Sequence, residues 1–339
     1  MSRLNKFKVA ITDSRYESHE IEREILSKIG AELIKFQCKT EDEVIRYCSD
    51  ADGLLNHYAP ITRRVIENLK NVKIIVRYGI GVDNIDLEAA TENGVMVANV
   101  IYDITDVADH ALSLMLSLIR KIPWIYESTK RGEWDWKKFQ PIIRLKGKTV
   151  GIIGFGRIGR KVAQRLRGFE VKLIAYDPHQ PSRVFKENMV ESVDLNTLLK
   201  ESDLITIHVP LTKETYHMIG EDELRKMKSH AFLINTSRGR VIDEKALYKA
   251  LKNRWISGAG LDVLENEPLR KDNPLLELDN VIITPHMAWY STTSITEIQR
   301  KAAEQVAKAL IGEIPENLVN TKVLKGVYPL RFKRKEKNE

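Results

Sequence analysis

Arg238, Glu267 and His286 each come a few residues after an apolar run of strand length. A histidine can give a proton to a carbonyl oxygen that becomes an alkoxide, because imidazole titrates near neutrality. A carboxylate bonded to its other ring nitrogen fixes the tautomer and favours the charged ring. A guanidinium can hold the carboxylate of a 2-oxo acid in a forked geometry. These three residue types therefore predict hydride transfer to a small 2-oxo acid.

Each of the three also has an ordinary structural explanation. Arg238 could form a surface ion pair, Glu267 could cap a helix before Pro268, and His286 could be packed in the core. All three residues follow strands of one predicted sheet, however, and ligands of open parallel sheets sit beyond the carboxyl ends of the strands. Their convergence there favours the catalytic interpretation.

A glycine-rich turn defines the second site. Residues 149–153 are rich in β-branched side chains and predict a buried strand, and the sequence Gly154-Phe155-Gly156-Arg157-Ile158-Gly159 follows directly. In such a turn the first glycine permits the bend, the second admits a pyrophosphate and the third allows close helix packing. Asp177 lies 18 residues after Gly159. A carboxylate there can accept both ribose hydroxyls and would repel a 2′-phosphate, so the motif predicts NAD rather than NADP.

Strand-like and helix-like segments alternate along the whole chain, which predicts parallel sheets with helical crossovers. The apolar runs occupy residues 7–12, 33–36, 53–56, 73–76, 95–97, 149–153, 171–176, 204–209, 231–235, 256–261 and 281–284. The helical patterns occupy residues 17–29, 41–47, 63–69, 87–92, 105–131, 157–166, 221–227, 244–253 and 294–311. Pro123 should kink or break the long helical pattern, in which His110 is expected to be a packed side chain. The last helix has no strand after it and must pack on an earlier part of the chain.

Composition excludes several other classes. The length of 339 residues predicts two domains, and the most apolar stretch, residues 111–119, is too short to span a membrane. The chain begins without a leader pattern, and Cys38 and Cys48 form neither a disulfide framework nor a metal cluster, so we expect a cytoplasmic protein without a metal. The net charge of +7 includes +4 from residues 325–339, which favours a solvated tail over nucleic-acid binding.

The sequence resembles the D-isomer-specific 2-hydroxyacid dehydrogenase family over nearly its whole length. The resemblance is carried by RYGIGVDNID at 77–86, VADHALSLML at 107–116, GIIGFGRIG at 151–159, INTSRGRVIDEKAL at 234–247, GAGLDVLENEP at 258–268 and ITPHMAWYS at 283–291. It implies two doubly wound parallel-sheet domains with a cleft between them. Residues 103–288 would form a Rossmann NAD domain, and residues 1–102 with 289–339 a flavodoxin-like substrate domain.

The same resemblance assigns roles to individual residues. Arg238 would bind substrate, Glu267 would pair with the catalytic histidine, and His286 would be the proton donor. Asp262 would meet the nicotinamide carboxamide. The other implied cofactor contacts are Gly154, Gly156, Arg157, Ile158, Gly159, Asp177, Val209, Pro210, Thr215, Thr236, Ser237 and Ala288. The implied substrate contacts are His57, Tyr78, Gly79 and Trp289, although Trp289 could equally be an aromatic that packs at a hinge.

Family branches differ in ways that this sequence addresses. Formate dehydrogenases pair the histidine with glutamine, whereas residue 267 is an acid, and regulated phosphoglycerate dehydrogenases carry an effector domain that we do not expect here. Residues 288–291 are most similar to the branch of the C-terminal binding proteins and related dehydrogenases. The resemblance thus implies a homodimeric reductase of glyoxylate, hydroxypyruvate or a 3-phosphoglycerate-type substrate. A corepressor-like interaction protein that responds to NAD(H) is the alternative. Arg63, Arg64 and Arg77 could hold a substrate phosphate or could be solvated.

Overall fold

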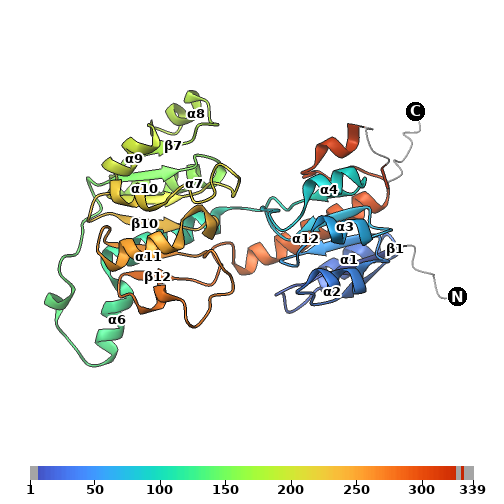
Figure 1. The fold of residues 1–339 in the computed structure, drawn as a ribbon, viewed down its shortest axis with the longest axis horizontal. Coiled ribbons are helices and arrows are strands. Elements are labelled where there is room, and N and C mark those ends of the chain that lie inside the picture. The colour runs from blue at the N-terminus through green and yellow to red at the C-terminus, as the bar shows by residue number, and fades with distance from the viewer. Residues whose placement is uncertain (1–6, 326–329, 332–339) are drawn as a thin grey trace. The chain divides into compact units, whose positions relative to one another are not determined.

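The computed structural model describes residues 7–325, 330 and 331, so most of the basic tail lies outside the described residues. The chain divides into two compact units. The smaller unit contains Met1–Asp103 and Ser291–Glu339, and the larger unit contains Ile104–Tyr290, a residue or two from the expected boundaries. Each unit contains its own β-sheet (Figure 1).

The smaller unit is built on a five-stranded parallel sheet. Its strand order, β2-β1-β3-β4-β5, is that of flavodoxin-like folds. The strands are β1 (Phe7–Ile11), β2 (Ala31–Lys35), β3 (Gly53–Asn56), β4 (Ile74–Arg77) and β5 (Met96–Ala98). The central strand β3 is buried on both faces, as expected for a parallel sheet that helices cover on both sides.

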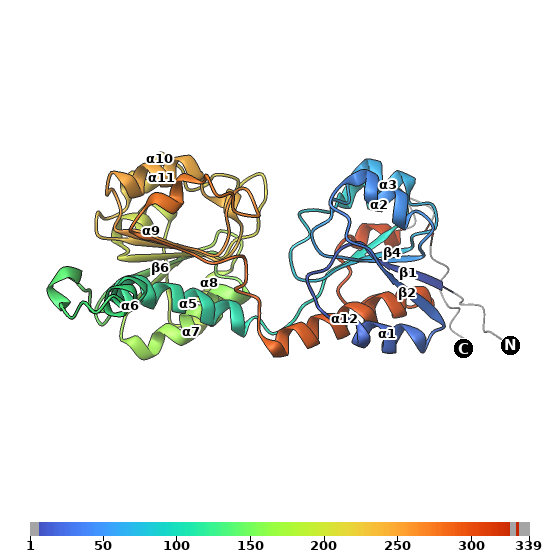
Figure 2. The same cartoon turned by 90° about the horizontal axis from the view of Figure 1, so that it is seen from below.

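Helices cover both faces of this sheet, with α1 and α12 on one side and α2 and α3 on the other (Figure 2). The helices are α1 (Glu20–Ser27), α2 (Glu41–Cys48), α3 (Arg63–Asn68), α4 (Leu87–Glu92) and α12 (Thr292–Leu310). Helix α12 begins at a capping box in which the Ser291 hydroxyl accepts the Ser294 N–H. It packs against α1, β3 and β4, so the last helix does return to the first part of the chain.

The larger unit has a seven-stranded parallel sheet in the order β12-β11-β10-β9-β6-β7-β8. Its strands are β6 (Thr149–Ile153), β7 (Lys172–Tyr176), β8 (Glu191–Ser192), β9 (Leu204–Ile207), β10 (Phe232–Asn235), β11 (Gly258–Leu261) and β12 (Val281–Ile283). This is the Rossmann order, with the chain reversing direction across the sheet between β6 and β9. The prediction of two parallel α/β sheets is therefore confirmed.

Helices again lie on both faces of the larger sheet, with α5 and α7 opposite α10 and α11 (Figure 2). The helices are α5 (Thr105–Arg120), α6 (Ile122–Lys130), α7 (Arg157–Leu166), α8 (Ser182–Glu187), α9 (Leu195–Glu201), α10 (Glu221–Lys226) and α11 (Glu244–Lys252). The predicted break near Pro123 is present: α5 stops at a left-handed Lys121, and α6 starts with Pro123 in its first turn. Short 3₁₀ segments occupy Trp136–Phe139, Arg167–Phe169, Gly239–Val241 and Pro274–Glu277, with Thr321–Lys325 in the smaller unit.

Candidate active site

The glycine-rich turn joins β6 to α7 at the point where the strand order reverses. Gly154 has φ +88°, and a Cβ there would lie 2.6 Å from the His208 carbonyl oxygen. A Cβ on Gly159 would lie 2.2 Å from the Gly154 carbonyl oxygen, so that glycine permits close packing of helix and strand. A Cβ on Gly156 would meet nothing within 4 Å, and no side chain caps the α7 N-terminus. The open space beside Gly156 at the start of α7 is compatible with the close approach of a pyrophosphate.

Asp177 follows β7 and lies beside this turn. Its Oδ2 accepts the Phe155 N–H at 2.8 Å, and its Oδ1 accepts the His179 N–H at 2.9 Å. A carboxylate has about four acceptor positions, so both oxygens can still receive a hydroxyl. The carboxylate is thereby held against the glycine-rich loop in a fixed orientation.

The other implied cofactor residues lie at the ends of neighbouring strands. Val209 lies beside Gly154, whose added Cβ would be 2.8 Å from Val209 Cγ1. In the loop after β9, the Thr215 hydroxyl donates to the Pro210 carbonyl at 2.6 Å. Arg157 and Ile158 form the first turn of α7, and the Ser237 hydroxyl donates to Asn235. The Thr236 hydroxyl oxygen is buried and has no hydrogen-bond partner within the described residues, which suits a loop that contacts a bound ligand.

Glu267 and His286 are brought together although they follow different strands. His286 Nδ1 lies 2.6 Å from Glu267 Oε2, and Glu267 Oε1 accepts the Leu264 N–H at 3.0 Å. Burial alone would raise the pKa of Glu267, but its hydrogen bond with the His286 ring acts in the opposite direction. Together with the Leu264 N–H and the Arg238 guanidinium, that ring brings the pKa of Glu267 below its usual value.

Arg238 lies at the same edge of the sheet. It follows β10, its Nη1 donates to the Ser237 carbonyl at 2.8 Å, and its charge is near enough to lower the pKa of Glu267. The β10–β11–β12 register places the ends of these parallel strands side by side. The residues that follow the strands therefore provide a guanidinium, a carboxylate and an imidazole at one location.

Asp262 has partners that the sequence analysis did not anticipate. It is 1% exposed, its Oδ1 accepts the Thr284 hydroxyl at 2.6 Å and the Met287 N–H at 2.9 Å, and its Oδ2 accepts the Ala288 N–H at 2.8 Å. The Trp289 ring N–H donates to the His286 carbonyl at 2.9 Å. Asp262, Ala288 and Trp289 therefore all contribute to the conformation of the loop that carries His286. The signal for this role was the position of Thr284, one residue from Pro285-His286.

The remaining predicted substrate residues belong to the smaller unit. Tyr78 is 2% exposed, its hydroxyl donates to the buried carboxylate of Glu22 at 2.7 Å, and burial together with that carboxylate raises its pKa. Gly79 has φ +142°, and its N–H donates to the Arg77 carbonyl at 2.8 Å. His57 is buried and its ring stacks on Tyr58. The Tyr78 hydroxyl and the Gly79 N–H are thus hydrogen-bonded within the smaller unit.

Two of the arginines considered for a phosphate have acidic partners. Arg63 contacts Glu92 at 2.5 Å, and Arg64 contacts Asp42 at 2.5 Å and Glu41 at 3.1 Å. These ion pairs favour the simpler explanation, in which both arginines are surface charges. Among the described residues, no cluster of histidine, cysteine, aspartate or glutamate side chains could hold a metal ion, and no helix could cross a membrane.

Comparisons with known proteins indicate the family of this chain. Residues 112–288 match the model of the "D-isomer specific 2-hydroxyacid dehydrogenase, NAD binding domain". A D-3-phosphoglycerate dehydrogenase of Methanocaldococcus jannaschii is 46% identical over 92% of this chain and 59% of its own length. A glyoxylate reductase of Korarchaeum cryptofilum is 44% identical over 83% of this chain and 86% of its own length.

A solved structure shows the same fold. It is D-lactate dehydrogenase from Aquifex aeolicus complexed with NAD and lactic acid, which is 32% identical, has a TM-score of 0.81 and covers 89% of this chain and 95% of its own. This chain thus spans a little over half of the first relative and nearly all of the solved structure. With NAD as the cofactor of the matched domain, the chain belongs to the D-isomer-specific 2-hydroxyacid dehydrogenase family.

Proposed function

We propose that this protein is an NAD-dependent D-2-hydroxyacid dehydrogenase that interconverts a short 2-oxo acid and its D-2-hydroxy acid. The observation that carries the proposal is the 2.6 Å contact between His286 Nδ1 and Glu267 Oε2 at the sheet edge that also holds Arg238. A proton donor, its orienting carboxylate and an anion-binding group are the parts that ketone reduction requires. Relatives named glyoxylate reductase and D-3-phosphoglycerate dehydrogenase support the same reaction class.

The proton comes from His286 in this proposal. An ionised carboxylate only accepts hydrogen bonds, and the lowered pKa of Glu267 keeps it ionised, so Nδ1 of His286 carries a hydrogen. Nε2 is then the ring nitrogen that gives a proton to the substrate oxygen during reduction and takes it back during oxidation. The negative charge of Glu267 stabilises the imidazolium that must be present before the proton is transferred.

Arg238 binds the substrate carboxylate or carbonyl. A guanidinium is always charged and donates two parallel hydrogen bonds, so it both selects a 2-oxo acid and polarises its carbonyl. When NADH is bound, the nicotinamide would provide the hydride for the carbonyl carbon. The chain's own contribution on that side is the open N-terminus of α7 for the pyrophosphate and the Asp177 carboxylate for the adenosine ribose.

Glyoxylate, hydroxypyruvate and the 3-phosphoglycerate pair are the candidate substrates. The ion pairs of Arg63 and Arg64 with acidic neighbours favour the two substrates without a phosphate. Trp289 is proposed to narrow the pocket, and the substrate contacts expected at His57, Tyr78 and Gly79 stay predictions. The cleft between the units and the cytoplasmic location stay predictions.

A panel assay tests this function. Purified protein with NADH should consume it in the presence of at least one of glyoxylate, hydroxypyruvate, 3-phosphohydroxypyruvate or pyruvate, and the product should have the D configuration. His286→Ala should lower kcat about 10²–10⁴-fold, while His230→Ala, a histidine whose side chain is 51% exposed and paired with Asp203, should leave it unchanged. No turnover with any acid of the panel, or full activity of His286→Ala, would overturn the proposal.

An exposed aromatic segment supports a homodimer as the functional form. Tyr126, Trp134 and Trp136 are 59%, 91% and 69% exposed on the segment that contains α6 and the following 3₁₀ turn. This segment extends away from the sheet of its unit (Figure 1). Large aromatic side chains gathered in this way indicate a protein interface.

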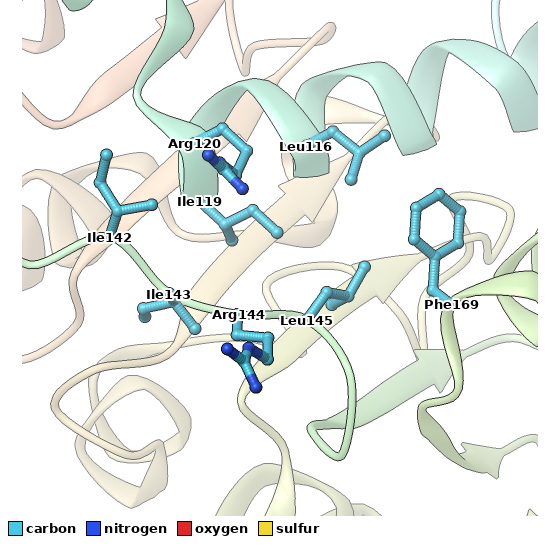
Figure 3. A pocket seen from close by; sticks show the side chains of 8 residues that line it. All are labelled: Leu116, Ile119, Arg120, Ile142, Ile143, Arg144, Leu145 and Phe169. Carbon is cyan, nitrogen blue, oxygen red and sulfur yellow. The ribbon is translucent and has the colours of Figure 1, made fainter.

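An apolar pocket of about 420 Å³ lies where this segment leaves and rejoins the larger unit. Leu116 and Ile119 of α5 face Leu145 and Phe169 across it, with Arg120 and Arg144 at its edge (Figure 3). We propose that a second copy of the chain covers this face. Its Trp134-Asp135-Trp136 sequence offers aromatic rings for the pocket and an acid for the arginines.

The exposed aromatic segment is also compatible with the alternative function. An interaction protein whose dimerisation responds to NAD(H) would also need an exposed aromatic segment. Measuring the oligomeric state with and without NADH beside the turnover assay separates the two. Turnover with a dimer that is indifferent to NADH supports the enzyme, whereas NADH-dependent dimerisation without turnover supports the interaction protein.

A further inference from the structure

The loop that carries His286 is held in an unfavourable backbone conformation. His286 has φ +52°, in the left-handed region that side chains other than glycine rarely adopt. Such a conformation is strained and persists only where the surroundings fix it. Here the Asp262 side chain fixes it, because its two oxygens accept the N–H groups of Met287 and Ala288, the two residues that follow.

The Asp262 carboxylate is itself held by a side-chain network that reaches helix α5. The Thr284 hydroxyl lies 2.6 Å from Asp262 Oδ1, and His110 Nε2 lies 2.9 Å from the Thr284 oxygen and 3.5 Å from Asp262 Oδ1. Sequence analysis expected His110 to be a packed side chain. It is instead one-fifth exposed and hydrogen-bonded across to the end of β12.

The direction of each hydrogen bond follows from counting protons. A carboxylate only accepts hydrogen bonds, so the Thr284 hydroxyl donates its proton to Asp262 Oδ1. A threonine hydroxyl has one proton, so its oxygen can only accept from His110. His110 therefore carries a hydrogen on Nε2 and donates it to Thr284. The donor sits on α5, a sixteen-residue helix that packs against β10 and β11 and provides a rigid support.

We propose that His110 is a positioning residue for the proton transfer: its Nε2–H, acting through Thr284 and Asp262, fixes the loop that aims the His286 ring at Glu267. This inference rests on the proposed function, since His286 is the proton donor only there. His110 contacts Thr284 and lies 3.5 Å from Asp262, so it acts on His286 through the loop. Without the donor, Thr284 can rotate its hydroxyl away from Asp262, and the strained turn is less firmly held.

Two substitutions at one position separate this role from simple packing. Glutamine places an amide N–H where Nε2 lies, whereas leucine fills similar space and donates nothing. The free protein is tested first, by hydrogen–deuterium exchange of the backbone amides in residues 285–290. We expect faster exchange in His110→Leu than in wild type, and exchange close to wild type in His110→Gln. Ser113→Ala, on the exposed face of the same helix, is the matched control and should change nothing.

Kinetics with the best 2-oxo acid of the panel give the second readout. His110→Leu should lower kcat about tenfold, with the KM for the 2-oxo acid within about twofold, because the substrate anchor Arg238 is untouched. His110→Gln should recover most of kcat. If His110→Leu does not fold, the same measurements are made on Thr284→Val, which lacks the hydroxyl, and on Thr284→Ser, which keeps it. The valine variant should then behave as expected for His110→Leu, and the serine variant should be close to wild type.

The inference would be overturned if the amides of residues 285–290 exchanged in His110→Leu at the wild-type rate. It would also be overturned if the leucine and glutamine variants had equal exchange rates and equal kcat. The amide exchange is measured without substrate or cofactor. An absence of turnover in wild type would therefore defeat the proposed function, while the exchange rates would still decide whether His110 holds the loop.

Discussion

The side chains of His286 and Glu267 meet at 2.6 Å although each leaves a different strand end of the larger sheet. His286 makes this contact from a left-handed backbone, which Asp262 stabilises through the two following N–H groups. Glu267 makes it from a partly buried position, where the Leu264 N–H and the Arg238 guanidinium favour the charged carboxylate. A local arrangement that three separate groups support in this way is characteristic of an active site.

Removing the charge of Glu267 while keeping its shape should slow catalysis. In Glu267→Gln an amide oxygen can still accept from His286, but the attraction to the imidazolium is lost. We expect kcat to fall about 10–100-fold, as for the loss of a charge-assisted hydrogen bond. Steady-state rates with saturating NADH measure this, and an unchanged kcat would show that Glu267 does not act on the proton donor.

The lowered pKa of Glu267 also sets the acid side of the pH profile. The favourable charge is present above the folded-state pKa and is lost as the pH falls through it. A carboxyl with an ordinary pKa would titrate near 4.3, so the rate loss caused by protonating Glu267 should occur below that pH. Initial rates of wild type and Glu267→Gln between pH 7 and the acid limit of stability test this. A Glu267-dependent fall in rate that begins near pH 6 would contradict it.

Arg238 should not be replaceable by lysine. An ammonium keeps the charge but cannot donate two parallel hydrogen bonds to a carboxylate. We expect Arg238→Lys to lower kcat/KM for the 2-oxo acid about 10²-fold, with the Kd for NADH unchanged. Arg240→Lys is the matched control, because Arg240 is exposed and its Nε contacts only the Glu265 carbonyl among the recorded hydrogen bonds. Equal kcat/KM in the two lysine variants would argue against a substrate-binding role.

Asp177 should determine the choice between NADH and NADPH. Asp177→Asn retains an oxygen for the Phe155 N–H but removes the charge that would repel a 2′-phosphate. The ratio of kcat/KM for NADPH to that for NADH should rise about tenfold or more, since two like charges at contact distance cost a few kcal/mol near a protein surface. If the ratio stays at the wild-type value, Asp177 does not contact the adenosine ribose.

The aromatic segment should hold the dimer together. Replacing Trp134 and Trp136 with alanine removes two of the most exposed rings of the larger unit. We expect the double variant to sediment as a monomer at concentrations where wild type is a dimer, with an unchanged circular dichroism spectrum. Trp255→Ala is a poor control because Arg225 stacks on that ring, so Tyr216→Ala, another exposed aromatic, serves instead. If the double variant stays dimeric, this segment is not part of the dimer interface.

Much of the fold could be predicted from the sequence because its signals are local. Strands that are buried on both faces read as continuous apolar runs, and the glycine-rich turn has a fixed relation to the strand before it and the helix after it. Helices α8 and α9, of six and seven residues, were not predicted, although α3, α4 and α10, of six residues each, were. Strand β8, of two residues, has no pattern of its own.

The convergence of the three residues could be predicted from the sequence, but the contacts that hold them in place could not. Arg238, Glu267 and His286 each follow a predicted strand, and topology alone brings strand ends to one edge. The link from His110 to Thr284 joins residues 174 positions apart, and nothing in either local sequence indicates it. In the same way, the buried contact between Tyr78 and Glu22 depends on how α1 packs, which a sequence pattern does not fix.

The most direct test of the account is the pH dependence of kcat for 2-oxo acid reduction in wild type and in His286→Gln. Because the protonated imidazole is the donor, the wild-type rate should fall as the pH rises. The glutamine variant, which has no titrating ring, should be slow and nearly independent of pH over the same range. A glutamine variant that keeps the wild-type rate, or the wild-type decline with pH, would contradict the assignment of His286 as the proton donor.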